Sequence, residues 1–161
     1  MAVLTLRRAV TIVAALLALV AAMPGRAQAP PAPTEYQVKA VFLFNFSQFV
    51  DWPPAAFADG RSPLVIGVLG RDPFGATLDE IVRGETVNGR PLAVRRYESV
   101  EQVEACHILF IDSSQEQQFD RILAALKGRS LLTVGDFADF ARRGGVISFV
   151  TVMNRDRKSV V

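Results

Sequence analysis

The sequence predicts an α/β protein in which a mostly parallel (mixed) sheet is covered by helices on both faces. Two segments, 64–69 (LVIGVL) and 106–111 (CHILFI), are apolar without alternation, which is typical of strands buried on both faces. Segments with helical spacing of apolar residues lie between such strands, and this alternation favours parallel strands joined by helices. With 161 residues, half of them hydrophobic, the chain has the length of one domain with a real core.

The first predicted element is a helix within 36–53 (YQVKAVFLFNFSQFVDWP). Thr34 can cap this helix, Gln37 can complete a capping box, and Pro53 ends it. On a helical wheel most apolar side chains fall in an arc of roughly 200°, which predicts burial on more than one side. The residues of this arc are Tyr36, Val38, Ala40, Phe42, Leu43, Phe46, Phe49 and Val50.

The opposite side of this helix carries polar residues, and two apolar residues interrupt them. Val41 and Phe44 are these exceptions. We expect them either to be covered by another part of the chain or to contact a partner.

The later elements follow from apolar spacing bounded by capping and turn residues. Asp72 is expected to cap a helix with Pro73 at its first position, and Asn88 with Gly89 marks a turn. In chain order, we expect strands at 64–69, 92–97, 106–111, 131–134 and 146–152, and helices after Asp72, at 115–127 and at 136–141. These elements predict a single three-layer, Rossmann-like domain.

The first 27 residues have the pattern of a secretory signal peptide. Arg7 and Arg8 precede an apolar run at 9–22, which is too short to span a bilayer comfortably. Cleavage is expected after Ala27 or Ala29, and an uncleaved anchor is the alternative. After cleavage we expect no membrane insertion.

The net charge of +2 depends on this signal peptide. Arg7, Arg8 and Arg26 lie in it and it contains no acid, so 15 basic residues face 16 acidic residues in the rest of the chain. A domain with this balance lacks the basic surface that nucleic acids require, and we expect no nucleic-acid partner.

The ends of the chain lie outside the predicted domain. Residues 28–33 (QAPPAP) are expected to form a stiff, proline-rich spacer, and 34–153 the α/β domain. Residues 156–161 (DRKSVV) have the sequence of the peptide that a widely used short-read sequencing adapter encodes in one reading frame. We therefore expect 154–161 to be a non-native tail, and genomic sequence continuing across these codons would contradict this.

Three acids follow three predicted strands: Asp72, Asp112 and Asp136. The carboxyl ends of parallel strands share a crevice, so an acidic metal pocket is one interpretation. Asp72 and Asp136 each precede a predicted helix, where a carboxylate accepts backbone N–H bonds, and Asp112 can do the same with Ser113 or Ser114 beside it. We favour capping and assign no metal.

No catalytic group can be assembled from the sequence. Cys106 and His107 are the only cysteine and histidine, and as neighbours on a strand they point to opposite faces, which excludes a zinc site and a Cys–His pair. The segment 70–77 resembles a phosphate-binding loop, but Ala76 stands where the lysine is needed. We therefore expect a binding or regulatory module without cofactor rather than an enzyme.

Several ordered blocks resemble the YfiR family. The blocks are 35–40 (EYQVKA), 44–46 (FNF), 51–53 (DWP), 68–75 (VLGRDPFG), 88–92 (NGRPL), 106–111 (CHILFI), 132–136 (LTVGD) and 140–145 (FARRGG). The resemblance covers residues 35 to about 150. It implies a periplasmic α/β protein of a Gram-negative bacterium that represses an inner-membrane diguanylate cyclase by binding its periplasmic sensor domain, lowering cyclic-di-GMP and restraining biofilm formation.

The chain departs from the family pattern in two places. Relatives often have a cysteine where this chain has Gly67, so a disulfide with Cys106 cannot form. Relatives also continue beyond the strand at 146 with a further strand and a C-terminal helix. We therefore expect a domain lacking its last strand and helix, with an unpaired sheet edge and exposed apolar surface.

The first functional hypothesis is a regulatory protein that docks on the sensor domain of a membrane-bound diguanylate cyclase. Val41, Phe44 and Gln48 on the first helix are the expected contact residues, because an apolar patch on a polar helix face is a natural hot spot. A homodimer is left open.

The alternative is a periplasmic small-ligand-binding protein. Its ligand would lie in a crevice formed by Arg71, Asp72, Ser113 and Asp136, at the carboxyl ends of the predicted strands.

Overall fold

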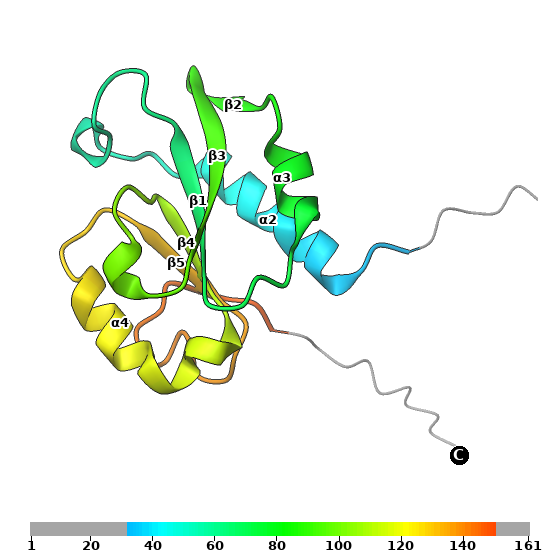
Figure 1. Cartoon of the computed structure of the whole chain (residues 1–161), viewed down its shortest axis with the longest axis vertical. Coiled ribbons are helices and arrows are strands. Elements are labelled where there is room, and N and C mark those ends of the chain that lie inside the picture. The colour runs from blue at the N-terminus through cyan, green and yellow to red at the C-terminus, as the bar shows by residue number, and fades with distance from the viewer. Residues whose placement is uncertain (1–31, 151–161) are drawn as a thin grey trace, which may run out of the picture. The chain divides into compact units, whose positions relative to one another are not determined.

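The computed structural model describes residues 32–150 (Figure 1). The helices are α2 (Glu35–Phe49), α3 (Ala76–Val82) and α4 (Phe119–Leu126). The strands are β1 (Leu64–Leu69), β2 (Thr86–Val87), β3 (Arg90–Tyr97), β4 (Ile108–Ile111), β5 (Leu132–Gly135) and β6 (Ile147–Ser148). Three 3-10 helices are η1 (Pro54–Ala56), η2 (Val100–Gln102) and η3 (Ser113–Gln118). The expected signal peptide (1–27), residues 28–31 of the spacer and the expected tail (154–161) lie outside the described residues.

The strands form a sheet in the order β2-β3-β1-β4-β5-β6. All neighbouring strands are parallel except β2 and β3, which form an antiparallel hairpin. Asn88 and Gly89 join these two strands with φ of 52° and 77°, the backbone conformation that a tight hairpin turn needs. The predicted mixed, mostly parallel sheet is confirmed.

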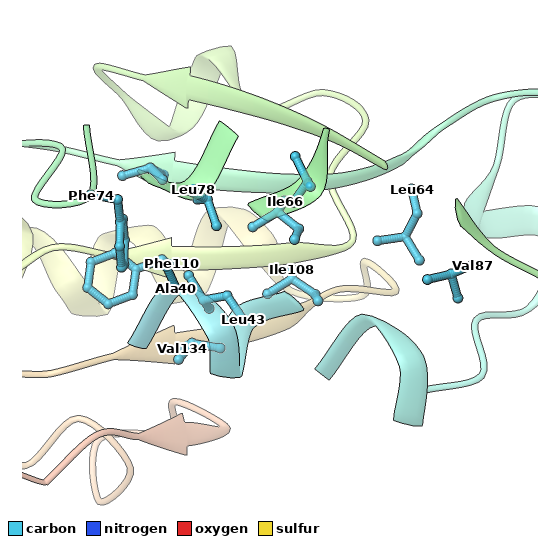
Figure 2. Packing of buried hydrophobic residues seen from close by; sticks show 12 residues of the cluster. Ala40, Leu43, Leu64, Ile66, Phe74, Leu78, Val87, Ile108, Phe110 and Val134 are labelled. Carbon is cyan, nitrogen blue, oxygen red and sulfur yellow. The ribbon is translucent and has the colours of Figure 1, made fainter. Parts of the chain in front are cut away.

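Helices cover both faces of this sheet. On one face Ile66 and Phe110 belong to a core cluster with residues of α2 and α3, as Figure 2 shows. On the other face Leu109 and Ile111 belong to a second cluster with Phe119 of α4. Alternate residues of β4 thus serve opposite faces, as the pleat of a strand requires. The predicted single α/β domain with helices on both sides is confirmed.

Helix α2 begins as its capping residues predict. The N–H of Gln37 donates to Oγ1 of Thr34 (3.3 Å), and the N–H of Thr34 donates to Oε1 of Gln37 (2.7 Å). These reciprocal bonds form a capping box, which satisfies backbone donors that have no partner within the helix. The helix ends at Phe49, before Pro53.

The predicted buried arc of α2 is only partly correct. Ala40 and Leu43 are fully buried as expected, but Lys39 is buried as well. In contrast, Phe42 is 47% exposed and Phe49 is 84% exposed. Apolar residues surround much of this helix, so local periodicity does not define its buried face. That face is set by packing against α3 and β4, which lie far along the chain.

Turns replace some of the predicted helical residues. Helix α3 begins at Ala76 rather than directly after Asp72, because the chain first turns through Gly75 at a φ of 54°. The segment after β4 forms the 3-10 helix η3, so α4 begins at Phe119. Residues 137–144 form turns where a short helix was predicted.

Phe140 accounts for these turns after β5. Its ring is fully buried and lies so close to Gly135 and Gly145 that a Cβ on either glycine would overlap it. The same ring stacks on Phe119 at a centroid distance of 4.7 Å and meets Phe137 edge-on at 5.1 Å. The turns therefore bring two aromatic rings onto α4, and the glycines make room for one of them.

Candidate functional site

Asp72, the first of the three acids after strands, is held by its own chain. Its Oδ1 accepts the N–H of Phe74 at 2.8 Å, and its Oδ2 accepts Nε of Arg96 at 2.6 Å. Arg96 also pairs with Asp79 of α3, and this hydrogen bond lowers the pKa of the Asp79 carboxyl. The three side chains fix the turn between β1 and α3 against β3, so Asp72 has a structural role here.

Asp112 follows β4 and caps η3. Its Oδ2 accepts the N–H of Ser114 at 2.7 Å. Arg71 approaches the same oxygen at 3.9 Å, but the Arg71 side chain is 82% exposed. The loop after β1 and the segment after β4 leave no space between them at this point, because a Cβ on Gly70 would lie 2.6 Å from Oγ of Ser114.

Asp136 follows β5 and joins it to α2. Its Oδ2 accepts Nζ of Lys39 at 2.8 Å and the hydroxyl of Tyr36 at 3.1 Å. The Lys39 and Asp136 side chains are only 8% and 6% exposed. Burial lowers the pKa of Lys39, but its hydrogen bonds to Asp136 and Glu35 outweigh this effect and raise it. The result is a buried ion pair between the first helix and the fifth strand.

The predicted ligand crevice is therefore not formed by contacts among its members. Arg71, Asp72 and Asp136 each pair with a different residue, and Ser113 is exposed at the start of η3. Among residues 32–150 no group of three or more His, Cys, Asp or Glu side chains could hold a metal ion. Ligand binding at this crevice stays a prediction.

Cys106 and His107 point to opposite faces, as predicted from their adjacency on one strand. Cys106 is buried in the core cluster beneath α4, and burial raises the pKa of its thiol to about 12, so the thiol stays protonated. His107 is buried on the other face, where Phe57 stacks on its ring at 4.3 Å.

The hydrogen bonds of His107 define a neutral ring. Nδ1 accepts the N–H of Val65 at 3.0 Å, so the proton is on Nε2, which donates to the carbonyl of Ala56 at 3.1 Å. Burial lowers the pKa of His107, in accord with this neutral form. His107 therefore anchors the loop containing η1 to the amino ends of the strands.

A cavity of about 170 Å³ lies beside this loop, which we name the Trp52 cavity. It is lined by Val50, Asp51, Trp52, Pro54, Phe57, Leu64, Val87, Asn88 and Arg90. This cavity was not predicted from the sequence. Two blocks of the family resemblance, DWP at 51–53 and NGRPL at 88–92, meet here, and their shared location was the signal that could have revealed it.

The second feature is the outer face of α2, defined by Val38, Val41, Phe42 and Phe49, which are 40%, 45%, 47% and 84% exposed. Beside it, Phe149 and Val150 line an apolar hollow with Val38 and Phe42. Of the expected contact residues, Val41 and Gln48 are exposed on α2. Phe44 is half-buried and packs against the core.

The fold is that of an α/β domain in which the acids at the strand ends stabilise turns and join a helix to the sheet, while an apolar helix face and a small cavity are accessible. Residues 36–160 match the YfiR/HmsC-like family, and the chain belongs to this family. No curated protein matches the sequence. Within residues 32–150 no helix has the length and hydrophobicity needed to cross a membrane.

Proposed function

We propose that this protein is a periplasmic regulator that inhibits an inner-membrane diguanylate cyclase by binding the periplasmic sensor domain of that enzyme. In this role it lowers cyclic-di-GMP and restrains biofilm formation. Membership of the YfiR/HmsC-like family is the observation that carries the proposal. The signal-peptide pattern of residues 1–27 supports export, and the accessible apolar surface supports a protein contact without catalysis.

The contact surface that we propose is the outer face of α2, extended by Gln48. Val41 and Phe49 give it exposed apolar groups on a rigid helix, and a few well-packed groups at the centre of an interface carry most of its binding energy. Phe44 supports this surface from below, because it packs on the core.

A matched pair of valines tests the surface. Val41 on α2 and Val146 before β6 are 45% and 60% exposed, so an aspartate at either position is tolerated by the fold. Val41→Asp is expected to abolish co-purification with the periplasmic domain of a membrane-bound GGDEF-type cyclase. Cellular cyclic-di-GMP is then expected to rise to the level found without the regulator. Val146→Asp is expected to behave like the wild type.

Two results would contradict the proposal at different levels. If the wild-type chain leaves cyclic-di-GMP unchanged when it is expressed with the cyclase, the regulatory function is wrong. If Val41→Asp and Val146→Asp bind equally well, the function can stand but the outer face of α2 is not the contact surface. Circular dichroism of both variants is the control for folding.

A further inference from the structure

The Trp52 cavity combines apolar and polar side chains. It lies at the amino ends of the strands, between the segment that follows α2 and the hairpin turn that joins β2 to β3. Trp52, Phe57, Leu64 and Val87 form apolar walls, and Asp51, Asn88 and Arg90 supply polar groups. Apolar walls with a few convergent polar groups are the usual make-up of a ligand pocket.

Arg90 is the fixed polar group of this cavity. Its Nη1 donates to the carbonyls of Asp59 and Ser62, each at 2.8 Å, and its guanidinium lies 3.7 Å above the centre of the Phe57 ring. These contacts hold the planar group in one orientation. Among the described residues, Nε and Nη2 of Arg90 have no hydrogen-bond partner. Two adjacent N–H donors in a rigid plane match the two oxygens of a carboxylate.

The other two polar groups limit the charge of a ligand. Asp51 is exposed at the rim, and its carboxylate repels a second negative charge. Asn88 is held at the rim by the hairpin turn and can donate or accept a hydrogen bond. This arrangement favours a monoanion over a phosphate or a dicarboxylate.

The volume limits the size of a ligand. A volume of about 170 Å³ corresponds to roughly six water molecules. This space accommodates one ring with its substituent and excludes a nucleotide. We propose that the Trp52 cavity binds a small monocarboxylate with a ring-sized apolar body. The carboxylate contacts Nε and Nη2 of Arg90, and the ring packs against Trp52. None of the residues that line this cavity belongs to the outer face of α2.

Trp52 makes the test specific, because it is the only tryptophan of the chain. Its fluorescence is followed while benzoate is added to the protein. We expect a saturable change in emission with benzoate. Benzamide has the same ring and nearly the same shape without the charge, and it is expected to bind at least about tenfold more weakly. Phthalate, which carries a second carboxylate, is expected to bind more weakly for the reason given for Asp51.

Two variants and one control assign the binding to this cavity. Arg90→Lys keeps the charge but loses the paired donors, so benzoate affinity is expected to fall about tenfold. Asp51→Asn removes an exposed charge with little risk to folding. It is expected to reduce the difference in affinity between benzoate and phthalate. Arg71→Gln removes an arginine at the opposite end of β1, where its side chain is 82% exposed, and is expected to leave benzoate affinity unchanged.

The proposal fails if benzoate causes no saturable change, or if benzoate and benzamide bind equally. It also fails if folded Arg90→Lys binds benzoate as well as the wild type. If Arg90→Lys does not fold, the affinities of Asp51→Asn for phthalate and benzoate decide. The same ratio of these affinities in Asp51→Asn and in the wild type would place the ligand away from this rim and contradict the proposal.

Discussion

At the carboxyl ends of the strands, Asp72, Asp112 and Asp136 all have hydrogen-bond partners within the chain. At the amino ends, Asp51 and Asn88 line a cavity and have no such partner among residues 32–150. The row of acids was the more conspicuous pattern in the sequence, yet its members stabilise turns and join a helix to the sheet. The position of an acid after a strand therefore does not by itself indicate a ligand site, because each of these carboxylates has a partner within the fold.

The largest expected effect tests the structural role of the carboxyl end. Lys39→Met leaves the buried Asp136 carboxylate without its cation, and the free energy of unfolding is expected to fall by about 3 kcal/mol or more in urea titrations. The double variant Lys39→Met/Asp136→Leu is the control, because removing both charges is expected to recover most of the loss. A loss below about 1 kcal/mol in the single variant would contradict the inference that Lys39 neutralises a buried carboxylate.

Gly70→Ala is expected to have the next largest effect. Gly70 has a φ of 95°, and a Cβ there would lie 2.6 Å from Oγ of Ser114, so backbone strain and overlap together are expected to cost about 2 kcal/mol. Gly60→Ala is the matched control, since no atom lies within 4 Å of its added Cβ. Equal stability of the two variants would mean that the loops around Gly70 are loosely packed.

Acid is expected to weaken the amino end selectively through His107. Burial lowers the pKa of His107 in the folded protein, so the unfolded chain binds the extra proton first as pH falls. The contribution of neutral His107 to the free energy of unfolding is complete above the ordinary pKa of about 6.5. It decreases as the pH falls from there through the lowered pKa of the folded state. Protonation of Nδ1 removes the acceptor for the N–H of Val65, a loss of about 1 kcal/mol.

The measurement for His107 is the free energy of unfolding between pH 5 and pH 7, taken as a range about its ordinary pKa. His107→Gln carries no titrating group and is expected to show a flatter dependence on pH over this range. A parallel dependence in the two proteins would assign the acid sensitivity to other groups.

Arg71→Gln is expected to have the smallest effect. The Arg71 side chain is 82% exposed and lies 3.9 Å from Asp112, so water screens the pair and stability is expected to change by less than about 0.5 kcal/mol. A larger loss would show that the loop after β1 depends on this contact, and would weaken the contrast between Asp112 and Asp136.

The sequence predicted elements whose signals are local. The capping box at Thr34 placed the start of α2, and the apolar run at 64–69 placed β1 with its observed bounds. The predicted sheet class also followed, because strands buried on both faces need helices on both sides.

Elements fixed by distant contacts were predicted less well. Lys39 is buried because Asp136 lies opposite it, 97 residues later in the chain, and no helical wheel contains that pair. The helix expected after Asp136 is absent from the described residues for a related reason, since Phe140 turns inward between two glycines. The Trp52 cavity was missed because its walls come from three segments that only the fold brings together.

The bond between Lys39 and Asp136 also bears on the order of folding. Helix α2 comes early in the chain, but its buried cation meets its partner only after β5 has emerged. Contacts with such long sequence separation form slowly, because a large loop must close before they are gained. Helix α2 can pack on α3 and β4 earlier, but its docking is expected to be complete only when Asp136 is available to pair with Lys39.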